Sequence, residues 1–265
     1  MGIVNVTPDS FSDGGQFFQA DRAVEHALDL ATHGADLLDI GGESTRPYSD
    51  PVSCQEELDR VVPVVESLRA REDVVISVDT SKAEVAKECL VHGIEIINDV
   101  TGLCGDAAMV PLAAESQVGV CVMHMQGTPR TMQDAPSYND VVEDVIGFLH
   151  GRRDVLISAG IAHDRICVDP GIGFGKTLQD NLRLLNHIHI FHRLGCPLLV
   201  GHSRKGFIDQ VLRDEIKEEN INRESGTLGV SLALAKQGVQ VLRLHEVETV
   251  RQALILFEAS GGWCP

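Results

Sequence analysis

Four side chains with complementary chemistry follow short apolar runs along this chain. Asp79, Asn98 and Asp169 end three of the runs, and Lys205 comes just after a fourth. Two carboxylates, an amide and an ammonium around one cavity would match a flat heterocycle, whose N–H groups donate to a carboxylate and whose carbonyl accepts from Lys and Asn. Each residue alone is as consistent with a helix cap or a structural ion pair. Because all four stand at corresponding points, we favour a ligand-binding role for the set.

A second group of candidates is basic and lies at the two ends of the chain. Arg243 and His245 end the last apolar run, and Asn5 ends the first. We expect a helix from Glu246, whose N-terminal N–H groups would favour an anion such as phosphate. The amide of Asn5 could bind a hydrated Mg²⁺ that bridges phosphates. The alternatives are a structural salt bridge for the basic pair and turn formation for Asn5.

A glycine-rich segment, GIGFGK, occupies residues 171–176. As a dinucleotide fingerprint it is weak, because the final glycine spacing and the partner acid are missing. We interpret it as a loop whose backbone approaches a flat ligand, with Phe174 as a wall. A plain turn between a strand and a helix is the alternative.

Eight such apolar runs must position these residues. Runs this short and apolar are typical of parallel strands buried on both faces. Eight strand–helix units predict an α/β fold, a single closed (β/α)₈ TIM barrel over residues 1–265, with its site at the carboxyl ends of the strands. Long polar loops follow the first two strands, at 7–19 and 41–53. The strands are expected at 1–6, 35–40, 74–79, 94–100, 120–124, 165–169, 197–201 and 238–244.

The segments between these strands have helical periodicity. We expect Ser81 or Thr80 to cap the third helix. The segment 214–223 is charged and is interpreted as a solvated excursion. The helices are expected at 21–33, 55–71, 82–92, 107–116, 138–159, 178–194, from 203 to 211, 225–237 and 246–259.

Composition and charge narrow the function classes. The chain is 43% hydrophobic and 23% charged, which is ordinary for a globular enzyme. A net charge of −17 with one Trp and two Tyr argues against nucleic acid or an anionic membrane as a partner. No apolar run approaches the roughly 20 residues that span a bilayer, and no signal peptide is recognisable. Seven scattered Cys predict reduced thiols in a cytoplasmic protein.

Seven motifs together resemble the dihydropteroate synthases. They occur in the order of that family and extend from strand one to Lys205, with Arg243 and His245 beyond them. They are NVTPDSFSDGG at 5–15, GGESTRP at 41–47, SVDTS at 77–81, IIND at 96–99, MHMQG at 123–127, DPGIGFGK at 169–176 and SRK at 203–205.

The resemblance implies a folate-pathway reaction in a homodimeric TIM barrel. Dihydropterin-6-ylmethyl diphosphate and 4-aminobenzoate would condense to dihydropteroate and diphosphate. By match of motif, Asp79, Asn98, Asp169 and Lys205 would hold the pterin, with Met123 and Phe174 near its faces. The remaining assignments place Mg²⁺ on Asn5, diphosphate on Asn5, Arg243 and His245, and the aminobenzoate under two loops that contribute Asp9, Phe11, Thr45 and Arg46.

The physical chemistry agrees with that reaction. Mg²⁺, Arg and His would neutralise the leaving diphosphate. Asp79 and Asp169 would stabilise the cation that its departure leaves on the pterin. We therefore favour a dissociative substitution, in which the neutral amine attacks and Asp9 shapes the cation site or receives the proton. No nucleophilic Ser or Cys is needed.

One position departs from the family pattern. Gly206 stands where a Ser usually follows Ser-Arg-Lys, so a backbone N–H toward the aminobenzoate carboxylate survives and the hydroxyl is lost. Affinity for 4-aminobenzoate and for the sulfonamides that mimic it is expected to differ. Two other functions remain open, a pterin-binding methyltransferase and a pterin binder without turnover. Asn5, Arg243, His245 and the SRK motif favour the synthase.

Overall fold

Eight parallel strands form the centre of this computed structural model, which describes residues 1–7, 16–71 and 73–262. Strands β1 to β6 pair with one another in sequence order, and β7 pairs with β8. Single bridges join Val168 to Leu198 and Gly2 to Leu244, so the ring closes. The predicted (β/α)₈ barrel is therefore confirmed. The strands are β1 (Gly2–Asn5), β2 (Leu37–Gly41), β3 (Val75–Asp79), β4 (Ile96–Asp99), β5 (Gly119–Met123), β6 (Ile166–Asp169), β7 (Leu199–Gly201) and β8 (Val241–Arg243).

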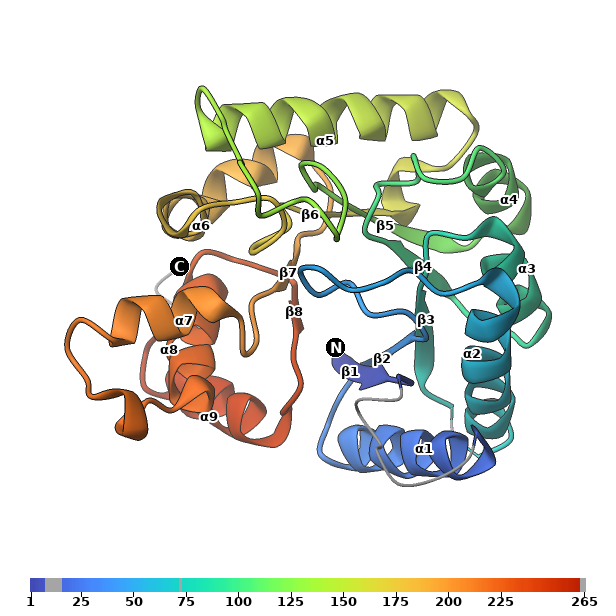
Figure 1. Cartoon of the computed structure of the whole chain (residues 1–265), viewed down its shortest axis with the longest axis horizontal. Helices are drawn as coiled ribbons and strands as arrows, with labels where there is room; N and C mark the ends of the chain where they lie inside the picture. The colour runs from blue at the N-terminus through green and yellow to red at the C-terminus, as the bar shows by residue number, and fades with distance from the viewer. Residues whose placement is uncertain (8–15, 72, 263–265) are drawn as a thin grey trace.

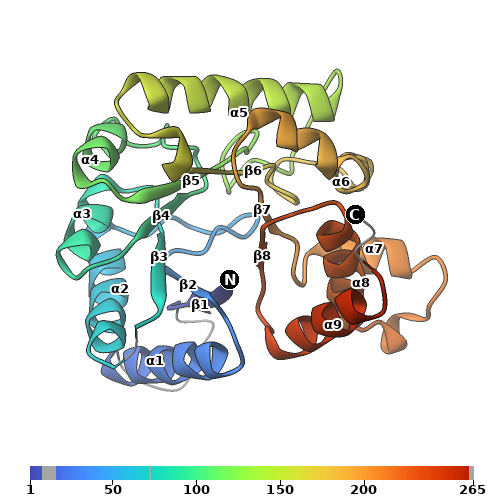
Figure 2. The ribbon, with the colours of Figure 1, turned by 180° about the vertical axis from the view of Figure 1, so that it is seen from behind.

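Helices surround this ring, as Figures 1 and 2 show from its two sides. Within the described ranges, no helix has the length and apolar character that crossing a bilayer requires. The helices are α1 (Gln16–Thr32), α2 (Cys54–Arg69), α3 (Ala83–Val91), α4 (Met109–Ser116), α5 (Val141–Ser158), α6 (Leu178–Asn186), α7 (Gly206–Leu212), α8 (Arg223–Lys236) and α9 (Glu248–Ala259), with short 3₁₀ turns η2 (His163–Arg165), η3 (Ile188–Leu194) and η4 (Glu218–Asn220).

The interior of the barrel changes from apolar to polar along its axis. Leu37, Cys167 and Val241 belong to a small apolar cluster inside the ring. Residues two apart in a strand share a face, so Asp39, Asp169 and Arg243 point into the same interior one step nearer the carboxyl ends. The larger core lies between strands and helices and consists mainly of Val, Leu and Ile. The charged side chains of Asp39, Asp169 and Arg243 therefore lie toward the carboxyl end of the barrel.

Several predicted element boundaries differ from the observed ones. The helix expected over 178–194 is α6 followed by the 3₁₀ segment η3. Neither Ser81 nor Thr80 caps α3. Its N-cap is Lys82, and the N–H of Ala83 donates to Asp106 Oδ2 at 2.9 Å. A cap from another loop cannot be recognised from local sequence, because both partners must first be folded.

Candidate functional site

A cavity of about 880 Å³ opens at the carboxyl ends of the strands. The loop after β2, the glycine-rich loop after β6 and the start of α7 contribute to its walls. Most predicted site residues that the structure describes line it, which places them in one site. Those residues are Asn5, Thr45, Arg46, Asp79, Phe174, Lys205, Gly206, Arg243 and His245.

Three of the predicted residues that the structure describes do not line the cavity. Asn98, Met123 and Asp169 are buried and are not among the described residues that line the cavity. Each belongs to a strand that ends at the cavity, so these three side chains lie in the layer beneath its surface. Asp9 and Phe11 lie outside the described residues.

Arg243 is the centre of a buried charge network. Its Nε donates to Asp39 Oδ2 at 2.6 Å, and its Nη2 donates to Asp79 Oδ2 at 2.8 Å. Asp39 Oδ2 also accepts from Asn98 Nδ2 at 3.0 Å. The Arg243 side chain is only 20% exposed and needs such partners, because desolvation without compensation is costly. The acidic and basic clusters that we treated as separate therefore form one network.

Asp39 is the residue of this network that we did not predict as functional. It is fully buried in the middle of β2, and its Oδ1 has no hydrogen-bond partner among the residues that the structure describes. The signal was present, since Asp39 ends an apolar run like the other candidates. Its partners, Asn98 and Arg243, are 59 and 204 residues away along the chain.

Burial shifts the pKa values of the ionisable groups at this end of the barrel. It raises the pKa of Asp79 to about 7, although Arg243 acts in the opposite direction. It raises the pKa of Asp169 against the attraction of Lys205, and it lowers the pKa of Lys205 to about 8 against the attraction of Asp169. Burial would also lower the pKa of Arg243, but Asp39 and Asp79 outweigh it and raise that pKa. Asp79 therefore changes its charge near neutral pH.

Lys205 reaches the glycine-rich loop from the start of α7. Its Nζ donates to the carbonyl of Ile172 and lies 4.4 Å from the centroid of the Phe174 ring. Asp169, on the neighbouring strand end, accepts the N–H of Gly171 at 2.7 Å. A cation over an aromatic face is attracted by the ring quadrupole. Phe174 and Lys205 thus form one wall of the cavity.

Side chains hold the carbonyls of the glycine-rich loop in a row. Four consecutive carbonyl groups each accept a hydrogen bond from a side chain. The donors are Lys205 to Ile172, Gln133 to Gly173, Lys176 to Phe174 and Tyr138 to Gly175.

All three glycines of that loop have positive φ, and two of them allow close packing against the loop after β5. A Cβ on Gly171 would lie 1.9 Å from the carbonyl oxygen of His124, and one on Gly175 would lie 2.4 Å from that of Gln126. The close approach that we predicted for the glycines is therefore made to protein backbone. Phe174 does line the cavity, as predicted.

Lys176 and His124 form a buried pair that sequence reasoning missed. Lys176 is 2% exposed, and its Nζ lies 3.0 Å from His124 Nδ1 and 2.9 Å from the Phe174 carbonyl. Burial lowers the pKa of Lys176 to about 7 and that of His124 to about 3, so the imidazole is neutral and Nδ1 can accept. Both residues stand inside motifs that we recognised, and His124 ends the fifth apolar run, but we assigned a ligand-binding role to neither.

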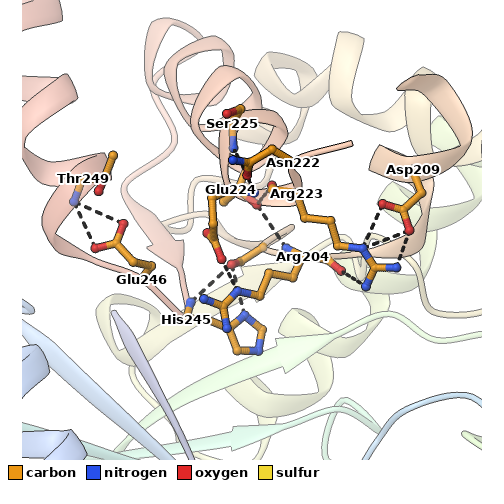
Figure 3. Close-up of polar contacts among 11 residues, drawn as sticks. Arg204, Asp209, Asn222, Arg223, Glu224, Ser225, His245, Glu246 and Thr249 are labelled. Atoms are coloured by element: carbon orange, nitrogen blue, oxygen red, sulfur yellow. Dashed lines mark hydrogen bonds and ion pairs between the residues drawn. The ribbon is translucent and has the colours of Figure 1, made fainter. Parts of the chain in front are cut away.

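The end of β8 differs from the anion site that we expected at a helix N-terminus. Helix α9 begins at Glu248, and the N–H of Thr249 donates to both oxygens of Glu246, at 3.1 and 3.2 Å (Figure 3). The carboxylate of Glu246 therefore takes the place that an external anion would take. His245 still lines the cavity, and its Nδ1 lies 3.1 Å from Ser203 Oγ. Burial and nearby arginines lower the pKa of His245 to about 3, so its imidazole is neutral.

Comparison with known proteins identifies a family. The model of a family described as pterin binding enzyme matches residues 1–245. The dihydropteroate synthase of Haemophilus influenzae is 45% identical over 261 residues, which cover 98% of this chain and 93% of that protein. That of Escherichia coli K12 is 46% identical over 260 residues, which cover 98% of this chain and 90% of that protein.

Solved structures agree with the sequence comparison. Yersinia pestis dihydropteroate synthase with a sulfonamide drug complex matches with a TM-score of 0.90 and 45% identity, over 98% of this chain and 93% of that one. The enzyme from Xanthomonas albilineans in complex with 7,8-dihydropteroate matches with a TM-score of 0.87 and 42% identity, over 100% and 94%.

Proposed function

The chain belongs to the dihydropteroate synthases of the pterin binding enzyme family, and from that membership we propose how its residues divide the work. It is a transferase of folate biosynthesis. It condenses 7,8-dihydropterin-6-ylmethyl diphosphate with 4-aminobenzoate and releases 7,8-dihydropteroate and diphosphate. The observation that carries this conclusion is similarity over nearly the whole chain, including the strand ends that line the cavity.

The pterin is held by the polar layer at the carboxyl end of the barrel. Asp79 and Asp169 accept from the N–H groups of the ring, while Lys205 and Asn98 donate to its carbonyl. Phe174 and Met123 pack near the ring faces. Asp39 supports this arrangement from below, because it holds both Asn98 and Arg243.

The diphosphate lies at Asn5, Arg243 and His245, with Arg46 at the rim. Arg243 brings a permanent positive charge, and His245 offers a neutral ring whose pKa an incoming anion would raise. A hydrated Mg²⁺ fits the amide oxygen of Asn5, because this ion usually keeps several waters and needs few protein ligands. Among the described residues, no cluster of three His, Cys, Asp or Glu could cage a metal. When bound, the ion would neutralise charge on the leaving diphosphate.

The substitution is dissociative. The bond between the pterin methylene carbon and the diphosphate oxygen breaks first, and the electron pair leaves with the diphosphate. The resulting cation is delocalised over the pterin, where ionised Asp79 and Asp169 stabilise it. The amine of 4-aminobenzoate then forms the new C–N bond and loses a proton, for which Asp9 is our candidate acceptor.

The aminobenzoate lies between the start of α7 and the loops after β1 and β2. The backbone N–H of Gly206 is available to its carboxylate, and a side chain at this position would meet open space. Thr45 and Arg46 line the same cavity, and the family resemblance adds Phe11 to the residues that we propose for aminobenzoate binding. Closure of such loops excludes water from a reactive intermediate.

Homodimerisation and a cytoplasmic location complete the proposal. The family resemblance supports the dimer, and light scattering on the purified protein tests it. Six cysteines among the described residues are free thiols, in line with a reducing compartment. Nucleic acid and membranes are not proposed as partners, because a net charge of −17 disfavours polyanions.

A coupled diphosphate-release assay tests the function. The protein is mixed with the pterin diphosphate alone, with 4-aminobenzoate alone and with both, and the pteridine product is followed by mass spectrometry. We expect stoichiometric diphosphate and dihydropteroate only when both substrates are present. Pterin binding without release would identify a binder that has lost turnover. Methyl transfer from a methylated folate would identify a methyltransferase instead.

A further inference from the structure

The turn that carries Lys205 into the cavity contains a strained residue. Arg204 has φ +58, in the left-handed region that favours glycine. For a residue with a Cβ, this conformation is disfavoured by roughly five- to thirty-fold relative to the right-handed one. The strain lies between Ser203, which accepts the N–H of His245, and Lys205, which donates to Ile172. The direction of the chain at Arg204 therefore decides where Lys205 points.

The first turns of α8 hold this residue from behind. The N–H of Arg204 donates to Thr227 Oγ1 at 3.1 Å, and the Thr227 hydroxyl in turn donates to the carbonyl of Arg223 at 2.8 Å. The guanidinium of Arg204 donates to Glu224, also on α8 (Figure 3). Thr227 is 1% exposed and is not one of the described residues that line the cavity. Its hydroxyl thus acts on the turn and has no direct access to substrate.

Two further contacts fix α8 relative to the same turn. Arg223 donates from Nε to both oxygens of Asp209 on α7, at 2.8 and 2.9 Å, and Figure 3 shows the two side chains facing each other. On the other side, His202 Nε2 lies 2.8 Å from Ser231 Oγ. Helix α8 therefore contacts the chain before and after Arg204. Thr227, in the same helix, contacts Arg204 itself, the residue with the strained backbone.

We propose that Thr227 is a positioning residue for Lys205 and for the N-terminus of α7, because its hydroxyl holds Arg204 in the left-handed conformation. This inference rests on the proposed role of Lys205 in pterin binding. Without the hydroxyl, only a fraction of molecules would have the competent turn. The apparent affinity for pterin falls by that fraction, while the bound complex still selects the competent turn.

The test compares Thr227→Val, which removes the hydroxyl at similar volume, with Thr227→Ser, which keeps it. For Thr227→Val we expect the KM for the pterin diphosphate to rise about tenfold and kcat to stay within about twofold. Thr227→Ser should stay within about twofold in both parameters. A role limited to stability would lower kcat through loss of folded enzyme and leave KM unchanged.

A double-mutant cycle with Arg204→Gly isolates the strain. Glycine adopts the left-handed conformation without the steric penalty, so Thr227→Val should change KM by less than about twofold in the Arg204→Gly background. An equal effect in both backgrounds would overturn the proposal. If Thr227→Val does not fold, as judged by circular dichroism, Thr227→Ala removes the same hydroxyl and carries the same expectation.

Rejection of the role of Thr227 can be distinguished from rejection of the proposed function. Parent enzyme that releases no diphosphate would contradict the function, and calorimetric Kd values for the pterin diphosphate would then decide the role of Thr227. Parent enzyme that turns over, with KM unchanged in Thr227→Val, would reject the positioning role alone.

Discussion

We assign Asp79 a catalytic role and expect it to carry a cost to stability, and Asp79→Asn should separate the two. The carboxyl is buried beside Arg243, and its pKa of about 7 compares with an ordinary value of 3.8. A difference of about 3 in pKa corresponds to about 4 kcal/mol, which is the upper limit of what this shift can change in the free energy of unfolding. Asn keeps an oxygen that can accept from Arg243 Nη2 and cannot ionise.

The sign of the pH dependence follows from proton binding. Between about pH 4 and 7 the unfolded chain has lost the Asp79 proton while the folded protein keeps it. The contribution of Asp79 to the free energy of unfolding therefore falls as pH rises through this window. The free energy of unfolding of Asp79→Asn minus that of the parent should therefore be larger at pH 8 than at pH 5. The two values should differ by less than about 4 kcal/mol. Its turnover should fall about 10²-fold, as expected when a charge aimed at the transition state is removed.

Urea unfolding at pH 5 and pH 8 and diphosphate release between pH 5 and 9 measure the two effects. Asp36→Asn is the matched control, because Asp36 is exposed and lies outside the cavity. In the parent, kcat/KM should rise as Asp79 loses its proton near pH 7. Unchanged turnover in Asp79→Asn would refute the catalytic role. An equal stability difference at both pH values would refute the raised pKa.

Three further predictions concern other parts of the site. Gly206→Ser places a hydroxyl in open space at the start of α7, so calorimetry should show several-fold tighter 4-aminobenzoate and altered sulfonamide affinity; equal values for both would dismiss a role for this position. Asn5→Ala should weaken the Mg²⁺ dependence of turnover about tenfold, measured by titration after chelation, and an unaltered Mg²⁺ titration would argue against Asn5 as a ligand. Burial lowers the pKa of Lys176 to about 7, so its contribution to stability rises with pH between about 7 and 10; Lys176→Met should flatten that rise in urea unfolding, and a parallel pH profile would contradict it.

The sequence predicted the barrel because its strands are local signals. Each apolar run is short and ends in a polar residue, and several of these polar residues lie at the carboxyl end of the barrel interior. The strand ends at Asn5, Asp79, Arg243 and His245 line one cavity for this reason. The family model matches residues 1–245, a range that includes these strand ends.

The sequence could not predict which side chains from distant segments contact one another. Arg243 pairs with Asp39 and Asp79, and Glu246 accepts the N–H of Thr249 where we expected an external anion. Thr227 has no motif of its own, and its role depends on the backbone conformation of Arg204, 23 residues away. Such contacts depend on tertiary geometry, so no local sequence pattern predicts them.

The contact between Lys205 and the Ile172 carbonyl has a consequence for inhibitor design. The Lys205 ammonium has three N–H donors, so only a ligand oxygen that draws Nζ away from the wall withdraws the donor that Ile172 now has. Part of the binding free energy of such a ligand is therefore lost, because the Ile172 carbonyl in the cavity wall is left unpaired. A compound that carries an N–H directed at Ile172, next to the oxygen directed at Lys205, would avoid that loss and should bind more tightly than one with the oxygen alone.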